Sequence, residues 1–314
     1  MAITFICPQR DTTPWVKALN ALDPQLDIRV WPHDHPKQAI ELALTWAHPP
    51  GVLREYPNLS CICSMGAGID HLLADPLLPD PSLPGNPEIV RLVDRELIRS
   101  MSEYLLLAVL YHFRQFDVYQ TRKQHKDWHP LLPPEKEACT IGIMGMGQLG
   151  GAAAITLSAA GFNVCGWRNS PEKKQGIPSF HGRDQLDDFL SLSRILICLL
   201  PLTQKTRHIL NLDTFSKLPP NAYLINVGRG GHLKEPDLLT ALDAGHLSGA
   251  CLDVFQTEPL PADHPFWQHP KIMVTPHISS QTDPISVAPQ ILENLARLRT
   301  GKPLLNRVNI KKEY

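Results

Sequence analysis

The chain has 314 residues, of which 43% are hydrophobic and 19% charged, so it holds enough apolar material for two packed domains. Its formal net charge of −1 gives no electrostatic reason to expect a nucleic acid or an anionic membrane as partner. Seven cysteines without a Cys-x-x-Cys pair predict free thiols in a reducing compartment, and the absence of a signal-peptide pattern or a long apolar stretch makes us expect a cytoplasmic protein.

Short β-rich segments alternate with helical patterns in the first hundred residues. The predicted strands are Ile3–Pro8, Leu26–Trp31, Ile40–Trp46, Ser60–Met65 and Ile89–Val93. Helical patterns cover Thr13–Leu22 and Gly51–Tyr56, and the proline-rich stretch Pro76–Pro87 is expected to be a surface loop. Because strands separated by helices are joined by right-handed crossovers, this alternation predicts a parallel sheet.

The middle of the chain has a different pattern. Residues Ser102–Phe113 are apolar nearly all round, which is typical of a helix buried between two bodies. The stretch Tyr119–Lys136 is polar and aromatic, includes Trp128 and three prolines, and is interpreted as an irregular excursion. Since obligate dimer interfaces are large and hydrophobic, the apolar helix and the aromatic excursion together predict a homodimer.

A second alternating series starts at Cys139. Its predicted strands are Thr140–Gly145, Asn163–Arg168, Ile195–Leu200, Ala222–Val227, Gly249–Val254 and Lys271–Thr275. Its predicted helices are Gln148–Ala160, Asp184–Ser191, Asp213–Leu218 and Glu235–Ala244. A last helix, Pro284–Thr300, is expected to complete the first domain. The predicted fold class is α/β, with two Rossmann-like, doubly wound parallel-sheet domains (residues 1–100 with 284–314, and residues 101–283) and the active site in the cleft between them.

The strand Thr140–Gly145 runs into Gly145-Met146-Gly147-Gln148-Leu149-Gly150, the Gly-x-Gly-x-x-Gly pattern of dinucleotide-binding turns. In this pattern Gly145 allows the tight turn, Gly147 lets the backbone approach a pyrophosphate, and Gly150 lets the next helix pack against the strand. The N-terminus of that helix offers N–H groups and a partial positive charge to the phosphates. The segment therefore predicts a bound dinucleotide.

The end of the second strand of this series indicates which dinucleotide is preferred. Enzymes that prefer NAD place an acidic residue there for the ribose 2′-hydroxyl, whereas this chain has Trp167-Arg168-Asn169-Ser170. The guanidinium of Arg168 attracts a 2′-phosphate, and the hydroxyl of Ser170 can donate another hydrogen bond. We therefore expect NADP(H) in preference to NAD(H); a solvated arginine after a strand is the alternative.

Three more segments follow predicted strands at the edge where open α/β sheets bind ligands: Asn226–Gly231, Asp253–Leu260 and Thr275–Ser279. Reduction of a 2-keto acid needs a cation for the carboxylate, a donor that polarises the ketone and an acid that delivers a proton. Arg229 suits the first two roles, and His277 suits the third with Glu258 to orient it. Each residue alone is more often structural, but their order downstream of a dinucleotide turn favours catalysis.

These residues resemble the D-isomer-specific 2-hydroxyacid dehydrogenase family, over essentially the full length of the chain. The matching segments are Ser64–Asp70, Gly145–Gly150, Asn226–Gly230, Asp237–Leu242, Asp253–Leu260 and Thr275–His277. Within the family the chain is similar to reductases of glyoxylate and hydroxypyruvate.

The resemblance implies NADPH-dependent reduction of glyoxylate or hydroxypyruvate to the hydroxy acid, with Arg229 binding and polarising the substrate and His277, paired with Glu258, protonating it. It also implies that Asp253 contacts the nicotinamide amide. The other implied cofactor contacts are Pro201, Thr206, Val227 and Gly228.

The first domain is expected to hold the substrate carboxylate. The turn Met65-Gly66-Ala67-Gly68 follows a predicted strand, and such a turn can present backbone N–H groups to an anion, although alone it would pass for a structural turn. Trp46 and Trp128 are candidates for closing a small pocket. In related hydroxypyruvate reductases a tryptophan of the excursion reaches the neighbouring subunit's site; for Trp128 the alternative is packing in the dimer interface.

Two other functions stay open: a dehydrogenase with another 2-hydroxy acid substrate, and a non-enzymatic nucleotide-sensing scaffold similar to the dehydrogenase-like corepressors. Turnover of NADPH with a keto acid distinguishes the scaffold from an enzyme. The segment His33-Asp34-His35 has no further ligand cluster near it in the sequence, so no metal site is expected.

Overall fold

The computed structural model describes residues 2–8, 10–76, 78, 87–132, 134–169 and 176–309. The chain divides into two compact units, which are called unit 1 (Met1–Leu97 with Gln281–Tyr314) and unit 2 (Ile98–Ser280). The boundaries expected after residues 100 and 283 lie close to these. Each unit is α/β and is built around one parallel sheet, as the sequence predicted.

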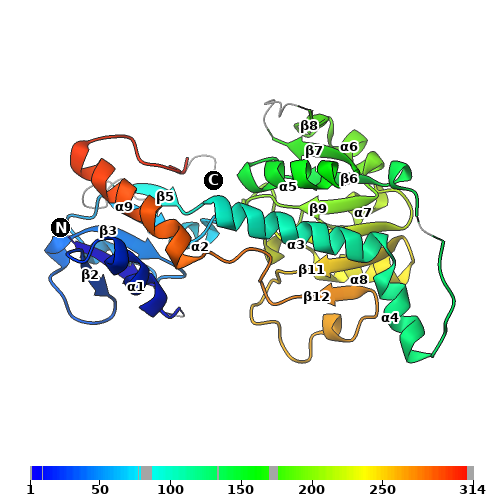
Figure 1. Ribbon diagram of the computed structural model, residues 1–314, viewed down its shortest axis with the longest axis horizontal. Helices are drawn as coiled ribbons and strands as arrows, with labels where there is room; N and C mark the ends of the chain where they lie inside the picture. Colours follow the sequence, from blue (N-terminus) through cyan, green and yellow to red (C-terminus); the bar gives the residue numbers. More distant parts are fainter. Residues whose placement is uncertain are drawn as a thin grey trace. The chain divides into compact units, whose positions relative to one another are not determined.

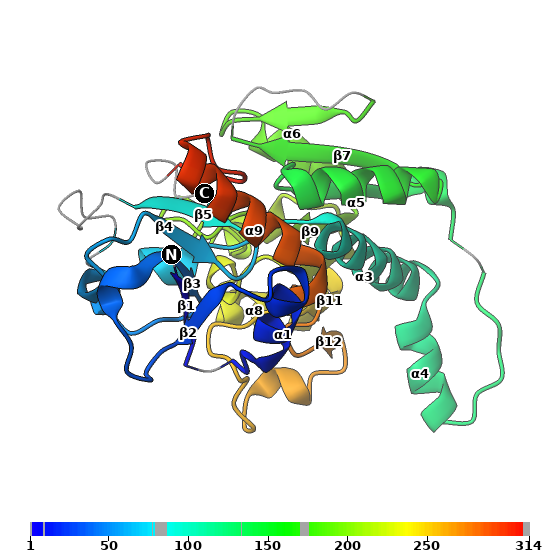
Figure 2. The same cartoon turned by 60° about the vertical axis from the view of Figure 1, so that its left-hand side comes forward.

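Unit 1 contains a five-stranded sheet in the order β2-β1-β3-β4-β5, with every pairing parallel. Its strands are β1 (Ala2–Ile6), β2 (Asp27–Val30), β3 (Ile40–Thr45), β4 (Cys61–Ser64) and β5 (Glu88–Arg91). The helices α1 (Thr13–Leu22) and α9 (Pro284–Thr300) lie side by side (Figure 1 and Figure 2) and bury Leu19, Ile291 and Leu295 in one core with Ile3 and Phe5 of β1. The alternate residues of β1, Ala2 and Ile6, belong to a second core on the opposite face, as the two-residue period of a strand requires.

This second core of unit 1 is covered by short elements. Residues Val52–Glu55 form the 3-10 helix η2, so the helical pattern expected over 51–56 is only a tight turn, which starts at Gly51 with φ +81°. The helix α2 (Asp70–Leu73) contributes Leu72 to the same core. The loop predicted over 76–87 lies mostly outside the described residues.

Unit 2 contains a seven-stranded parallel sheet in the order β12-β11-β10-β9-β6-β7-β8. Its strands are β6 (Thr140–Met144), β7 (Asn163–Arg168), β8 (Ser179–His181), β9 (Ile195–Cys198), β10 (Ala222–Asn226), β11 (Leu247–Leu252) and β12 (Ile272–Val274). Its helices are α3 (Arg95–Phe113, from Ile98 onward), α4 (Phe116–Gln124), α5 (Gln148–Ala159), α6 (Leu186–Leu192), α7 (Leu212–Ser216) and α8 (Glu235–Asp243).

The sheet of unit 2 is apolar on both faces. On one face α3 and α5 bury Leu105 and Leu157 against alternate strand residues such as Ile143 and Ile197. On the other face α6, α7 and α8 bury their side chains against Leu196, Leu224 and their neighbours. Strands covered on both sides are near-continuous hydrophobic runs, which explains why the sequence located them well.

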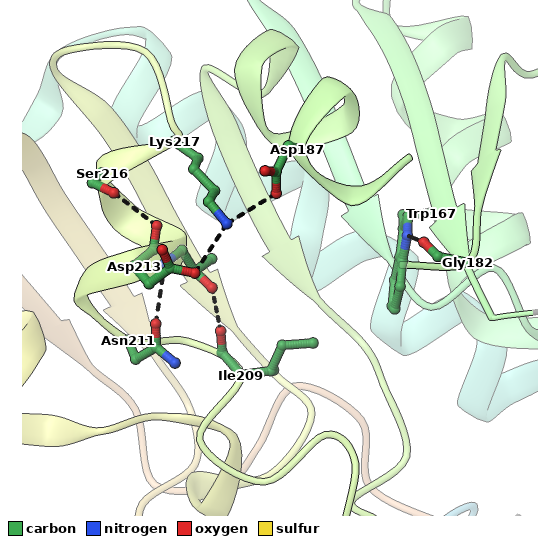
Figure 3. Close-up of polar contacts among 9 residues, drawn as sticks. Trp167, Gly182, Asp187, Ile209, Asn211, Asp213, Ser216 and Lys217 are labelled. Carbon is green, nitrogen blue, oxygen red and sulfur yellow. Dashed lines mark hydrogen bonds and ion pairs between the residues drawn. The ribbon is translucent and has the colours of Figure 1, made fainter. Parts of the chain in front are cut away.

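Figure 3 shows how α7 is fixed at its ends. The side chain of Asn211 caps the helix by accepting a hydrogen bond from the Thr214 N–H, and Lys217 forms ion pairs with Asp213 (2.9 Å) and Asp187 of α6 (3.0 Å). Ion pairs at such exposed positions contribute only about 0–1 kcal/mol each, so the cap is the more important of the two features.

Three predictions for unit 2 were wrong in detail. The helix α3 begins at Arg95 rather than Ser102, and Leu107 on it is 60% exposed rather than buried all round. Residues 116–124, partly assigned to an irregular excursion, form α4; the helix escaped prediction because none of its side chains is buried and it has no apolar stripe. The three-residue strand β8 was missed because it is too short to show a period.

Candidate active site

The dinucleotide turn has the geometry that its glycines predict. Gly145 follows β6 with φ +105°, a conformation that L side chains rarely adopt. A Cβ added to Gly150 would lie only 1.9 Å from the Gly145 carbonyl oxygen, so glycine is needed for α5 to start this close to β6. A Cβ on Gly147, in contrast, would meet nothing within 4 Å, which leaves this part of the backbone open to a ligand.

The helix that follows the turn fits a pyrophosphate. α5 has 12 residues and begins at Gln148, with Gly147 as its N-cap. Its first turn, which includes Leu149, contains no acidic residue. The first N–H groups of a helix lack intrahelical partners and carry a partial positive charge, so they can bind phosphate oxygens. The residues present therefore fit the dinucleotide that the sequence predicted.

Arg168 is the last residue of β7 and is half-buried. Two hydrogen bonds join this end of β7 to Gly182, the residue after β8. The Trp167 indole N–H donates to the Gly182 carbonyl oxygen (2.8 Å, Figure 3), and the Gly182 N–H donates to the Arg168 carbonyl oxygen (3.0 Å). This fixes the strand end at which the 2′-phosphate is expected. Ser170 lies outside the described residues.

The segment after β9 is folded around one hydroxyl. Thr206 Oγ1 donates to the Pro201 carbonyl oxygen (2.7 Å) and accepts from the Thr203 N–H (2.8 Å). The Pro201 carbonyl oxygen also accepts a hydrogen bond from His232 Nε2 (3.2 Å), while His232 Nδ1 accepts from the Arg229 N–H (3.0 Å). His232 therefore joins the expected cofactor segment to the expected substrate arginine.

Arg229 follows β10, after the buried residues Val227 and Gly228. Its Nη1 donates to the Gly228 carbonyl oxygen (2.8 Å), and the Asn226 side chain donates to its carbonyl oxygen (3.1 Å). Next to it, a Cβ on Gly230 would lie 1.8 Å from the Phe255 carbonyl carbon, so glycine lets this loop approach the segment after β11. The guanidinium is half-buried at the carboxyl edge of the sheet, where it can bind an anion.

His277 and Glu258, which are 19 residues apart in sequence, are in direct contact. His277 Nδ1 lies 2.7 Å from Glu258 Oε2, and the other carboxylate oxygen accepts from the Phe255 N–H (3.0 Å). Partial burial raises the pKa of Glu258, but the hydrogen bonds from His277 and Phe255 and the charges of His277 and Arg229 outweigh it and leave this pKa below its ordinary value.

A pKa that is lowered on folding has a defined consequence for stability. The stabilising contribution of Glu258 is present above the pKa of the carboxyl in the unfolded chain and is lost as the pH falls through its pKa in the folded chain. At neutral pH Glu258 is therefore ionised and can orient His277 with its Nδ1–H toward the carboxylate. The other ring nitrogen, Nε2, is left to deliver a proton.

Asp253 lies directly after β11 and is fully buried. One of its carboxylate oxygens accepts from Thr275 Oγ1 (2.6 Å) and from the Ile278 N–H (2.8 Å), and the other accepts from the Ser279 N–H (2.8 Å). In this structure its carboxylate therefore binds residues 275–279, which are called the His277 turn. Its expected contact with the nicotinamide amide stays a prediction.

The expected carboxylate-binding turn of unit 1, residues 65–68, follows β4. The carbonyl oxygens of Gly66, Ala67 and Gly68 accept hydrogen bonds from the Leu92 N–H (3.3 Å), Arg91 Nη1 (3.4 Å) and Ser64 Oγ (2.6 Å). Because the C=O and N–H of a trans peptide point in opposite directions, the N–H groups of Ala67, Gly68 and Ile69 point away from these donors. The backbone N–H groups of such a turn can bind an anion.

Trp46 follows β3 and lies beside this turn. A Cβ on Gly66 would lie 3.0 Å from its ring, Arg10 stacks over the ring at 3.8 Å, and His71 packs against it at 4.5 Å between ring centroids. His71 Nε2 also contacts Ser64 Oγ (2.9 Å). The structure thus brings the expected substrate residues Trp46 and Met65–Gly68 of unit 1 together.

Trp128 is not packed against any of these residues. Its side chain is 96% exposed in the segment after α4, and Leu132 nearby is 89% exposed. Among the described residues, no group of three or more His, Cys, Asp or Glu side chains is arranged to hold a metal ion. In the same part of the chain, no helix is long and apolar enough to cross a membrane.

Sequence reasoning missed His232, His71 and Tyr104. His232 could have been noticed, because it stands three residues after Arg229 in Gly228-Arg229-Gly230-Gly231-His232. Tyr104 carries no such signal, because Cys251 and Thr275, which its hydroxyl contacts, are distant in sequence. His71 contacts the nearby Ser64, but only the fold of the turn between them brings the two side chains together.

The sequence model of the D-isomer specific 2-hydroxyacid dehydrogenase NAD-binding domain matches residues 105–279. The chain is 41% identical to the glyoxylate/hydroxypyruvate reductase A of Photorhabdus laumondii and 41% identical to that of Serratia proteamaculans, over the whole of each chain.

Two solved structures are similar over the full chain. One is a D-isomer specific 2-hydroxyacid dehydrogenase from Xanthobacter autotrophicus in complex with NADPH and MES (36% identity, TM-score 0.95, 100% and 99% of the two chains). The other is the NADPH-dependent glyoxylate/hydroxypyruvate reductase of Sinorhizobium meliloti in complex with NADP and sulfate (35% identity, TM-score 0.92, the same coverage).

Proposed function

The chain belongs to the D-isomer specific 2-hydroxyacid dehydrogenase family, and from that premise we propose that it reduces small 2-keto acids with NADPH, glyoxylate to glycolate and hydroxypyruvate to D-glycerate. The observation that carries the proposal is the 2.7 Å contact between His277 and Glu258, in the unit that also holds Arg229 and the dinucleotide turn. The names of the relatives at 41% identity support this choice of substrates.

In the proposed reaction the bound NADPH supplies a hydride to the keto carbon. Arg229 binds the substrate carboxylate and polarises the ketone with its planar fork of donors. His277 protonates the carbonyl oxygen from Nε2, while Glu258 holds Nδ1–H and stabilises the imidazolium from which the proton leaves. In this scheme Glu258 keeps His277 Nδ1 in a hydrogen bond, so that only Nε2 reacts.

The preferred cofactor in this proposal is NADP(H). Similar structures from two organisms are complexes with NADPH or NADP, and in this chain Arg168 replaces the acidic residue that binds the ribose 2′-hydroxyl in NAD enzymes. We assign Gly145–Gly150 to the pyrophosphate and Arg168, with Ser170, to the 2′-phosphate. The remaining assigned contacts are Pro201, Thr206, Val227, Gly228 and Asp253.

For the substrate carboxylate we assign the N–H groups of the 65–68 turn, with Trp46 limiting the size of the keto acid. Two observations support this assignment. The carbonyl groups of the turn point toward Leu92 and Ser64, so that the N–H groups point the other way, and Gly66 lies against the Trp46 ring. Seven free cysteines, six of them buried, suit a reducing compartment, so the cytoplasm stays the expected location.

We also propose that the protein is a homodimer through the surface formed by α3, α4 and the following segment. Large apolar side chains are exposed there: Leu107 (60%), Phe116 (51%), Trp128 (96%) and Leu132 (89%). Large exposed apolar side chains on elements that follow one another in the chain are typical of a protein–protein interface. Light scattering is expected to give about twice the chain mass of 35.1 kDa, and a mass near that of one chain at micromolar concentration would contradict the dimer.

The assay that tests the proposed reaction follows the absorbance of NADPH with glyoxylate, hydroxypyruvate and pyruvate, and repeats each with NADH. Turnover with glyoxylate and hydroxypyruvate and a higher kcat/KM with NADPH are expected. Turnover restricted to another keto acid would keep the enzyme class and replace the substrate. Tight NADPH binding without turnover of any keto acid would support a nucleotide-sensing scaffold instead.

A further inference from the structure

Behind the His277 turn, a chain of hydrogen bonds runs from α3 to Asp253. Tyr104 of α3 places its hydroxyl 2.6 Å from Thr275 Oγ1, which in turn lies 2.6 Å from Asp253 Oδ1. On its other side the Tyr104 hydroxyl lies 3.4 Å from the Sγ of Cys251, a fully buried residue of β11. Cys251 belongs to the core that α3 covers, and Asp253 follows it by two residues, directly after β11.

The direction of each bond follows from the number of protons available. Thr275 has one hydroxyl proton and donates it to the carboxylate of Asp253, so Tyr104 must be the donor to Thr275. Tyr104 has then used its own proton, so the thiol of Cys251 donates to the tyrosine oxygen. Burial raises the pKa of Tyr104 far above its ordinary value, so the phenol keeps its proton for this bond.

Asp253 connects this chain of hydrogen bonds to the His277 turn. Its carboxylate accepts the Ile278 and Ser279 N–H groups, and its backbone carbonyl accepts the His277 N–H (2.9 Å). His277 itself has φ +53°, a left-handed conformation that a residue with a Cβ adopts only when its surroundings hold it. The bonds to Asp253, together with a contact of the His277 N–H with the Thr275 carbonyl oxygen (3.1 Å), hold the backbone of His277 in place. The hydroxyl groups of Thr275 and Tyr104 in turn hold Asp253.

We propose that Tyr104 is a positioning residue for the proposed reaction, acting through Thr275 and Asp253 to hold the His277 turn so that the imidazole stays in contact with Glu258. The inference rests on the proposed function for its kinetic meaning. For the structure, the proposal means that the phenolic hydroxyl of Tyr104, in addition to its ring, fixes the His277–Glu258 pair.

The first test compares Tyr104→Phe with Tyr111→Phe, which removes a phenolic hydroxyl from the same helix away from the chain of bonds. In Tyr104→Phe, kcat for glyoxylate is expected to fall about 2- to 10-fold, the range that one neutral hydrogen bond corresponds to, while KM for NADPH stays unchanged. Tyr111→Phe is expected to leave both unchanged. Equal kcat values in the wild type and Tyr104→Phe would overturn the proposal.

The second test asks whether Tyr104 acts through the His277–Glu258 pair. Glu258→Gln is expected to move the pH profile of kcat to lower pH, because the protonated imidazole loses the carboxylate that stabilises it. Tyr104→Phe should produce a smaller displacement in the same direction, and no further displacement when added to Glu258→Gln. Equal displacements in both backgrounds would show that Tyr104 acts elsewhere.

Two further measurements keep the inference testable if Tyr104→Phe folds poorly or the wild type shows no turnover. Thr275→Ser keeps the hydroxyl and is expected to behave like the wild type, whereas the similarly shaped Thr275→Val should reproduce the loss. In protein with 15N-labelled histidines, the His277 signals, assigned by their absence in His277→Asn, should titrate differently in Thr275→Val. Titration identical to the wild type would refute the positioning role whether or not the proposed reaction occurs.

Discussion

Two glycine-rich turns follow parallel strands in this chain, and their surroundings differ. After β6, Gly145–Gly150 leads into the 12-residue helix α5, with a left-handed Gly145 and an open backbone at Gly147. After β4, the 65–68 turn leads only into the four-residue α2, and its carbonyl groups are fixed by Leu92, Arg91 and Ser64.

The difference shows that a glycine-rich turn alone does not specify a ligand. The first turn combines N–H groups with the dipole of a long helix, which suits a pyrophosphate. The second has no long helix behind it. Its peptide groups are instead oriented by the side chains of Arg91 and Ser64 and the backbone N–H of Leu92, which suits a small carboxylate next to Trp46. Alanine substitutions in each turn, and a charge change at Arg168 near the first, distinguish the proposed pyrophosphate site from the proposed carboxylate site.

The largest effect is expected for Gly150→Ala. The new Cβ would lie 1.9 Å from a backbone oxygen, so either α5 or the turn must move. Overpacking typically costs about 1–3 kcal/mol of folding free energy, and NADPH binding should be lost with the turn geometry. Thermal unfolding and fluorescence titration with NADPH measure the two effects; an unchanged Tm with normal NADPH affinity would contradict the close packing of helix and strand.

Arg168→Asp is expected to have the next largest effect. Loss of one charge-assisted hydrogen bond to the 2′-phosphate is worth about 1.5–3 kcal/mol, or about 10- to 150-fold in affinity. The ratio of kcat/KM with NADPH to that with NADH should fall by at least this factor, mainly through KM, at low salt where charge effects are least screened. A variant with the wild-type ratio would remove Arg168 from the cofactor site.

Gly147→Ala tests the open backbone of the first turn. Because its Cβ would meet no protein atom within 4 Å, Tm is expected to stay at the wild-type value. The methyl group should nevertheless block the approach of a pyrophosphate and weaken NADPH binding about tenfold, or ~1.4 kcal/mol. Unchanged NADPH affinity would place the pyrophosphate elsewhere.

The smallest effect is expected for Gly66→Ala in the second turn. Its Cβ would lie 3.0 Å from the Trp46 ring, which must shift by a few tenths of an ångström. KM for glyoxylate should rise a few-fold, with KM for NADPH unchanged, because only the turn of unit 1 is altered. A change confined to KM for NADPH would reverse the assignment of the two turns.

Much of the fold could be predicted from the sequence, because its strands are buried on both faces. The apolar runs located all strands of unit 2 except the three-residue β8, and α1 and α9 have the predicted ends. The failures have two causes: α4 buries no side chain, so tertiary context rather than an apolar period determines it, and β8 is too short to show a period.

The candidate site was predicted in part. The Gly145–Gly150 turn and the pairing of Glu258 with His277 have local signals, namely glycine spacing and residues that follow parallel strands. The chain of bonds from Tyr104 to Asp253 has none, since α3 and β11 are far apart in sequence. The same holds for the left-handed backbone of His277, which depends on those contacts.

The substitution His277→Asn tests most directly whether His277, held by Glu258, protonates the keto acid. With saturating NADPH and glyoxylate at neutral pH, kcat is expected to fall about 10²- to 10⁴-fold, the usual worth of a general acid. The Kd for NADPH from fluorescence should stay at the wild-type value, because the dinucleotide turn is intact. A variant that binds NADPH normally and keeps the wild-type kcat would contradict the role of His277.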